Sequence, residues 1–78
     1  MSIHGLSLRD LEYLVAVAEH GHFGRAADAC HVSQPSLSAG VRKIEDTLGF
    51  RVFERTSRKV LITRRGAAAV ARAHAVID

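Results

Sequence analysis

Two helical segments separated by a very short connector constrain the fold of this chain more than any other feature. Residues 24–30, GRAADAC, predict a short helix, and residues 34–48 predict a longer one that begins after the N-cap Ser33. Pro35 fits the first turn of the longer helix, where a missing N–H leaves no hydrogen bond unmade. Only a two-residue turn remains between the short helix and this cap. Helices joined this tightly are typical of a helix-turn-helix.

Apolar residues around this unit recur at helical spacing and predict a small helical core. Residues 7–20 predict a first helix, with Ser7 as its N-cap, Asp10 in the capping-box position and Gly21 at its end. Gly24 takes the cap position of the short helix. The residues expected to face the core are Leu8, Leu11, Leu14, Val15 and Ala18 in the first helix, Phe23, Ala26, Ala27 and Cys30 around the second, and Leu37, Val41, Ile44 and Leu48 in the third.

The outward face of the helix over residues 34–48 differs from an ordinary solvated surface. Its first half carries small uncharged residues, where an exposed helix usually carries Glu and Lys. Small residues let a helix backbone approach a bulky neighbour, which is either a nucleic-acid groove or a helix of another protein. The outward-pointing residues are Pro35, Ala39, Arg42 and Asp46, flanked by Ser38 and Lys43, and the small ones are Ser36, Ser38, Ala39 and Gly40.

The pattern changes after Gly49 and predicts a hairpin followed by a last helix. Residues 50–63 contain two short β-branched or aromatic stretches around Thr56-Ser57-Arg58, which indicates a β-hairpin with basic residues at its tip. Thr63 caps an Ala-rich helix over residues 64–78. The fold class is therefore mainly α: a winged helix-turn-helix domain over residues 1–63, with three helices and a two-stranded wing, followed by a long C-terminal linker helix. Because no Gly or Pro ends this helix, we expect a second domain beyond it.

Charge is concentrated in one part of the chain. The net charge is +3, but residues 42–65 hold eight basic and three acidic side chains, whereas residues 1–41 hold two basic and four acidic ones. Such a basic segment is either the footprint of a phosphate-binding surface or a solvated face.

Several classes of protein are disfavoured by the composition. The single Cys excludes an internal disulfide and fits a reducing compartment, and no apolar run is long enough for a membrane span, so we expect a cytoplasmic protein. Metal binding by Cys30 with His20, His22, His31 and His74 is disfavoured because their spacing matches no zinc module known to us. No nucleophile lies near a base in a recognisable pattern, so we expect no enzyme activity and no cofactor.

The residues in this order resemble the N-terminal domain of the LysR-type transcriptional regulators over roughly residues 6–66, and the stretches RDLEYLVA, CHVSQP and ERTSRKV resemble the peroxide-responsive branch of that family. The resemblance implies a longer protein with a C-terminal sensing domain that carries the peroxide-reactive cysteine pair, which Cys30 does not match. Arg64 departs from the pattern, because a proline is common there. The matching motifs are Phe23, Ala26-Ala27, Val32 to Pro35, Leu37-Ser38, Glu45, Leu48-Gly49, Phe53 to Arg55 and Leu61 to Thr63.

Side-chain chemistry then predicts which residues contact DNA. In a helix-turn-helix the second helix enters the major groove, where Gln bonds adenine, Ser reaches bases or phosphates, and Pro contacts a thymine methyl group. The candidates on the recognition helix are Ser33, Gln34, Pro35, Ser36, Ser38 and Ala39, with Arg42, Lys43 and Arg25 as phosphate contacts. For Ser33 and Pro35 the alternative is a purely structural role at the helix start.

The wing, residues 54–60, is expected at the minor groove of A·T-rich DNA, with Arg58 as the inserting residue. Its other candidates are Arg55, Thr56, Ser57 and Lys59. Arg55 has two interpretations: it contacts DNA, or it locks the wing to the body through Glu54 or a helix terminus.

The last helix predicts a homodimer on an imperfect DNA palindrome. Its seam consists of Ala67, Val70, Ala71, His74 and Ile77. The alternative is packing of part of this seam against the first helix. A tetramer is an option for the full-length protein, and no small-molecule ligand or membrane contact is expected. The alternative function is a protein-interaction module that uses the small-residue face of residues 34–48.

Overall fold

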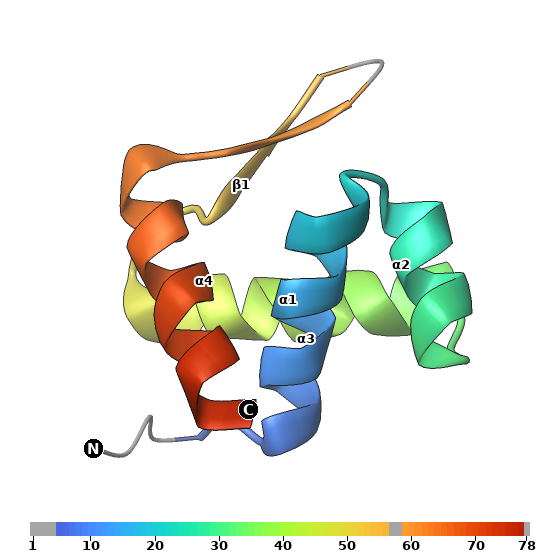
Figure 1. Ribbon diagram of the computed structural model, residues 1–78, viewed down its shortest axis with the longest axis horizontal. Coiled ribbons are helices and arrows are strands. Elements are labelled where there is room, and N and C mark those ends of the chain that lie inside the picture. Colours follow the sequence, from blue (N-terminus) through green and yellow to red (C-terminus); the bar gives the residue numbers. More distant parts are fainter. Residues whose placement is uncertain (1–4, 57–58, 78) are drawn as a thin grey trace.

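The computed structural model describes residues 5–56 and 59–77, which form four helices and a two-stranded antiparallel sheet (Figure 1). The expected mainly helical fold with a winged helix-turn-helix is confirmed, whereas the domain boundary at residue 63 stays a prediction. In chain order the elements are α1 (Leu8–His20), α2 (Phe23–Cys30), α3 (Gln34–Leu48), β1 (Phe53–Arg55), β2 (Val60–Ile62) and α4 (Arg64–Ile77). None of the helices in the described ranges combines the length and apolarity needed to cross a bilayer.

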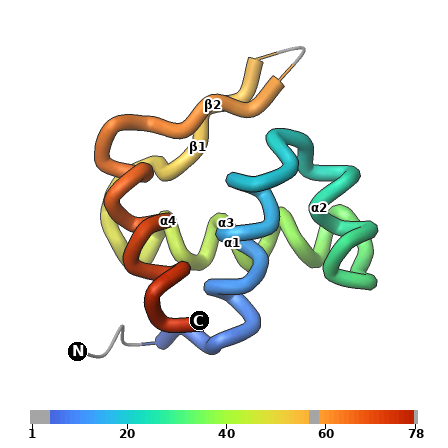
Figure 2. Tube along the Cα trace, viewed as in Figure 1, coloured from blue at the N-terminus to red at the C-terminus, as the bar shows by residue number. Residues whose placement is uncertain are grey.

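Helix α1 is the centre of the fold, because it contacts each of the other three helices. It runs beside α4, and α3 crosses behind the pair, while the hairpin projects from the end at which α4 begins (Figures 1 and 2). The core is formed mainly by buried aliphatic side chains, and the largest fully buried ones are Leu14, Val17, Leu37, Ile44 and Val52. The expectation that Leu8 faces this core is wrong, since 54% of it is exposed.

Local signals set most helix ends as expected. Ser7 and Asp10 form the reciprocal capping box of α1, and Gly21 and Gly49 take the left-handed conformation that ends α1 and α3. The predicted cap of α2 is wrong. His22 is the N-cap in place of Gly24, and its Nδ1 accepts the Arg25 backbone N–H at 3.1 Å. An imidazole nitrogen here performs the acceptor role that Ser or Asp usually has.

Helices α1 and α3 are closely packed at Gly40. A Cβ atom at this position would lie 2.5 Å from Cδ2 of Tyr13, which is itself buried. Gly40 is buried too, so its expected place on the exposed face of α3 is wrong. The small residue serves helix packing against α1, and the ring of Tyr13 fills the space that a side chain would need.

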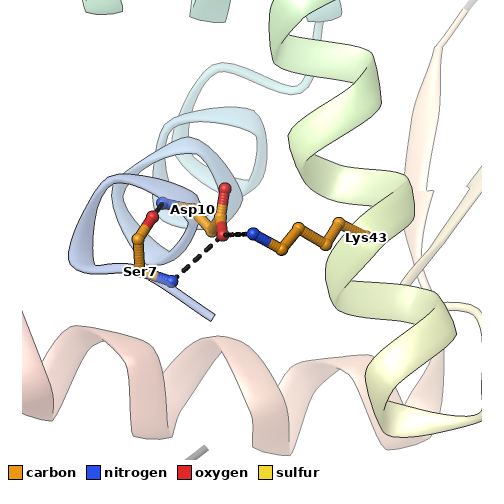
Figure 3. Close-up of polar contacts among 3 residues, drawn as sticks. All are labelled: Ser7, Asp10 and Lys43. Atoms are coloured by element: carbon orange, nitrogen blue, oxygen red, sulfur yellow. Dashed lines mark hydrogen bonds and ion pairs between the residues drawn. The ribbon is translucent and has the colours of Figure 1, made fainter. Parts of the chain in front are cut away.

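Asp10 and Lys43 form a second link between α1 and α3 (Figure 3). Lys43 Nζ lies 3.2 Å from Asp10 Oδ2, and the same oxygen accepts the Ser7 backbone N–H at 3.1 Å. Burial raises the pKa of the Asp10 carboxyl, but the hydrogen bonds from Ser7 and the charge of Lys43 outweigh burial and hold it below its ordinary value. The carboxylate is thus favoured in the folded chain.

Helix α4 starts from the hairpin and packs back on α1. The Thr63 hydroxyl accepts the Gly66 backbone N–H at 2.9 Å and donates to the Arg51 carbonyl at 2.7 Å. Gly66 is buried, and a Cβ there would overlap the backbone of Val52. Further along, Ala73 is only 1% exposed. Helix α4 is therefore anchored to the rest of the domain at its start and along its length.

Gly40→Ala should destabilise the chain, although alanine is the better helix former. Overpacking against Tyr13 is expected to cost about 1–3 kcal/mol, against a gain of up to about 1 kcal/mol in helix propensity. The matched control is the reverse change at the next position, Ala39→Gly, which should cost only about 1 kcal/mol because residue 39 is exposed. Urea unfolding measures both, and an unchanged or raised stability of Gly40→Ala would contradict the close contact.

Asp10→Asn should lower the free energy of unfolding near neutral pH by about 0.5–1 kcal/mol, because it removes the ion pair with Lys43. Since the pKa of Asp10 is lower in the folded chain, its contribution is complete above an unfolded pKa of about 4 and disappears as the pH falls through the folded value. Urea unfolding of wild type and variant across this range should show the difference shrinking in acid. In a Lys43→Met background Asp10→Asn should cost less, and an equal, pH-independent loss in both backgrounds would argue against the pair.

Candidate nucleic-acid interface

The start of α3 is shaped by its serines. Ser33 is the N-cap, and its hydroxyl oxygen accepts the Ser36 backbone N–H at 3.2 Å while donating to Ser36 Oγ at 3.0 Å. Pro35 lies in the first turn, as predicted. The helix therefore opens with exposed hydroxyl groups and with backbone N–H groups that carry its positive dipole end.

The exposed face of α3 carries most of the residues expected to read DNA. The exposed ones are Gln34, Pro35, Ser36, Ala39, Arg42 and Lys43. Two residues of the predicted set are engaged by the domain itself: Ser38 is half-buried beside the hairpin, and the exposed Lys43 pairs with Asp10. Arg25 is exposed on the first turn of α2. The first half of α3 thus offers a small-residue surface, with Arg42 further along the same face.

Glu45 fixes the root of the hairpin to α3. Its Oε2 accepts the backbone N–H groups of Val52 at 2.8 Å and of Phe53, the first residue of β1, at 3.2 Å. In the sequence Glu45 stands out only as one residue of the motif that resembles the LysR-type regulators. Its contact with the hairpin depends on the path of the chain after Gly49, which the residue spacing along α3 does not reveal.

Arg55 attaches the hairpin to the body a second time. Its Nη2 donates to Ser38 Oγ at 3.1 Å, and its guanidinium lies 3.7 Å from the centre of the Phe23 ring. Phe23 also meets Phe53 edge to face, with ring centroids 6.3 Å apart. Of the two interpretations, the contacts match the lock on the body, although the partner is Ser38 rather than Glu54 or a helix terminus.

The outer part of the wing is closed by Thr56 and Lys59. The backbone N–H and the hydroxyl of Thr56 both donate to the Lys59 carbonyl, at 2.9 and 3.0 Å, and the Lys59 N–H donates back to the hydroxyl at 3.0 Å. Both residues are exposed. The predicted contacts Ser57 and Arg58 lie outside the described residues.

A groove of about 620 Å³ separates α3 from the hairpin. Three arginines, Arg42, Arg51 and Arg55, line it from α3, from the connection to β1 and from the wing. Arg51 was not among the predicted contacts. The sequence does not show in which direction the chain leaves α3 after Gly49, and therefore not that Arg51 lies beside the groove. The other lining residues are Phe23, Ser38, Val41, Glu45, Asp46, Gly49, Phe50 and Phe53.

Cys30 and the histidines do not gather into a site. Within residues 5–56 and 59–77 no three metal-ligating side chains lie together. Burial raises the pKa of the Cys30 thiol, and the Glu12 carboxylate adds to this, while Arg9 opposes it. A half-buried thiol held in its neutral form suits the expected role of Cys30 as a small apolar residue.

The family pattern described as "Bacterial regulatory helix-turn-helix protein, lysR family" matches residues 8–67. The chain is 61% identical over 72 residues to "DNA-binding transcriptional dual regulator OxyR" of Escherichia coli K12 and, equally, to "Hydrogen peroxide-inducible genes activator" of Pectobacterium carotovorum. These matches cover 92% of this chain but only 24% of the relatives, so the chain spans about a quarter of their length.

Solved structures of LysR-type regulators have the same fold as this chain. Full-length OxyR C199D of Pseudomonas aeruginosa superposes with a TM-score of 0.88 at 50% identity, over 92% of this chain and 24% of the other. A complex of the CbnR DNA-binding domain with DNA gives 0.88 at 35% identity, over 92% of this chain and 83% of the other. The sequence pattern, the high identity over nearly the whole chain and the shared fold lead to one conclusion: this chain belongs to the LysR family of bacterial regulatory helix-turn-helix proteins.

Proposed function

We propose that this chain binds duplex DNA in a sequence-specific manner as the DNA-binding part of a transcription regulator. Helix α3 enters the major groove with its first turns, and the hairpin reaches the adjacent minor groove. The observation that carries this proposal is that α3 and the hairpin border a single groove that is lined by three arginines, Arg42, Arg51 and Arg55.

The chemistry of α3 supports base reading near its start and backbone contact further along. Gln34 is exposed in the first turn and can bond an adenine edge in two places, and Ser36, exposed two residues later, can reach a base or a phosphate. Arg42, two turns later, suits a phosphate. A protein-docking role for this face is not favoured, because Gly40 is buried and the basic hairpin would have no partner.

The first test is the salt dependence of duplex binding. If the chain neutralises about six to ten phosphates, affinity should fall about 10³–10⁵-fold between 50 and 200 mM salt. Fluorescence anisotropy with a duplex selected by this chain from a random pool measures it. Binding that ignores salt would rule out the proposed interface.

Gln34→Ala should relax the preference at one base position by about 1–3 kcal/mol, with a smaller effect on nonspecific DNA. Selection from a random duplex pool, followed by sequencing, reads this directly. Glu12→Ala, on the exposed side of α1, is the control and should leave the selected motif unchanged. A motif identical to wild type with Gln34→Ala would remove Gln34 from the base-reading set.

The parent regulator would respond to peroxide, as the names of its relatives indicate for them, and would act in the cytoplasm without enzymatic activity of its own. The 61% identity supports this assignment, but it covers the DNA-binding part alone. Peroxide sensing would depend on cysteines outside these residues, because Cys30 is half-buried and its raised pKa disfavours the reactive thiolate.

The regulator would act as a dimer joined through α4. Val70 and Ile77 of the predicted seam pack against the domain's own core, and His74 Nε2 lies 3.2 Å from Glu19 Oε2 on α1. This part of the seam therefore matches the alternative of packing on the first helix. The rest is exposed, and it continues into a face available to a second copy, formed by Ala67, Ala68, Ala71, Ala75 and Val76.

Ala71→Glu should break such a dimer, because it places like charges on the close-packed face of two alanine-rich helices. Light scattering of the chain bound to a palindromic duplex should change from two chains per duplex to one. Glu12→Ala should again leave the stoichiometry unchanged. Two chains per duplex with Ala71→Glu would move the dimer interface elsewhere.

A further inference from the structure

We propose that Arg55 is a positioning residue that sets the distance between the wing and helix α3, and that it does not serve as a phosphate ligand. The inference rests on the proposed DNA binding and goes beyond it. It changes which of the basic residues beside the groove determine affinity through charge and which through geometry.

The contacts of Arg55 join three elements. The side chain starts on β1, its guanidinium covers the Phe23 ring of α2 at 3.7 Å, and its Nη2 donates to Ser38 Oγ of α3 at 3.1 Å. Phe23 is 7% exposed and cannot move without disturbing the core. The guanidinium is therefore held on its face by a buried ring and at its edge by α3, while the backbone of Arg55 belongs to the wing.

This geometry requires an arginine. A guanidinium is planar, so it can stack on a ring with its face while its edge donates hydrogen bonds in that plane. A lysine ammonium has no face to stack and donates from a single point. Lysine would preserve the positive charge for DNA but not the link between Phe23 and Ser38.

Arg55 holds the hairpin at a second point, away from its root. Glu45 holds the root of β1 through two backbone N–H groups, which fixes where the hairpin leaves the body. A short two-stranded hairpin fixed only at its root is free to tilt. Arg55, at the far end of β1, fixes the tilt, so the wing and α3 present a constant spacing to two neighbouring grooves of the duplex.

The discriminating measurement is the slope of log affinity against log salt concentration, which falls by about 0.9 for each lost phosphate contact. Arg55→Met should weaken binding to the selected duplex by about tenfold through lost preorganisation, with the slope unchanged. Arg55→Lys should bind as weakly. Lys59→Met, which removes an exposed charge from the same hairpin, is the matched control and should lower the slope. A slope lowered by Arg55→Met, with full affinity restored by Arg55→Lys, would overturn the proposal.

A double-mutant cycle tests the link to Ser38. Ser38→Ala should weaken binding several-fold in the wild-type chain and have no further effect in the Arg55→Met chain, because its partner is already gone. Additive losses would mean that the two residues contact DNA independently, against the proposal. Far-ultraviolet circular dichroism of each variant shows whether the helices remain folded, which is expected because Arg55 is exposed.

Failure of the proposed function would look different. If the wild-type chain binds no duplex, DNA recognition itself is wrong, and the Arg55 variants are then compared by the protection of the hairpin amides in hydrogen exchange. Faster exchange in Arg55→Met and Arg55→Lys supports the positioning role, and unchanged exchange overturns it.

Discussion

Helix α3 is held along both edges by contacts that leave its outer face exposed. On one edge Gly40 lies against Tyr13, and Lys43 pairs with Asp10. On the other edge Glu45 binds the root of the hairpin, and Ser38 receives a hydrogen bond from Arg55. Because these contacts are made at the two edges of α3, the outer face between them remains exposed, with small residues in its first half. The groove, the wing and the proposed DNA contact all depend on this division of one helix surface.

The helices, their caps and the hairpin could be predicted because they depend on neighbours in the sequence. Ser7, Ser33 and Thr63 each cap the helix that follows them, which a local pattern reveals. Apart from the cap of α2, which is His22 and not Gly24, the errors concern contacts between elements. Gly40, expected to be exposed, is buried, and Leu8, expected to be buried, is exposed. Helical spacing shows which residues share a face of a helix, but not which other element covers that face.

The sequence predicted which residues surround the candidate site, but not the contacts that these residues make with one another. The basic segment and the small-residue face were evident, yet the sequence could not show that Lys43 and Arg55 are engaged within the domain. An arginine and a lysine beside a groove have the same appearance in a sequence whether they bind phosphate or protein. Only the positions of Asp10, Phe23 and Ser38 separate the two cases, and these positions depend on how α1, α2 and α3 cross.

The start of α4 has a mechanical consequence for the wing. Thr63 binds the Arg51 carbonyl through its hydroxyl and the Val52 carbonyl through its N–H, at 2.7 and 2.9 Å, and Gly66 lies directly on the Val52 backbone. Both ends of the hairpin thus meet the first turn of α4. A rotation of α4 about its axis must either move the base of the hairpin with it or break these bonds, so torque applied to α4 is transmitted to the wing.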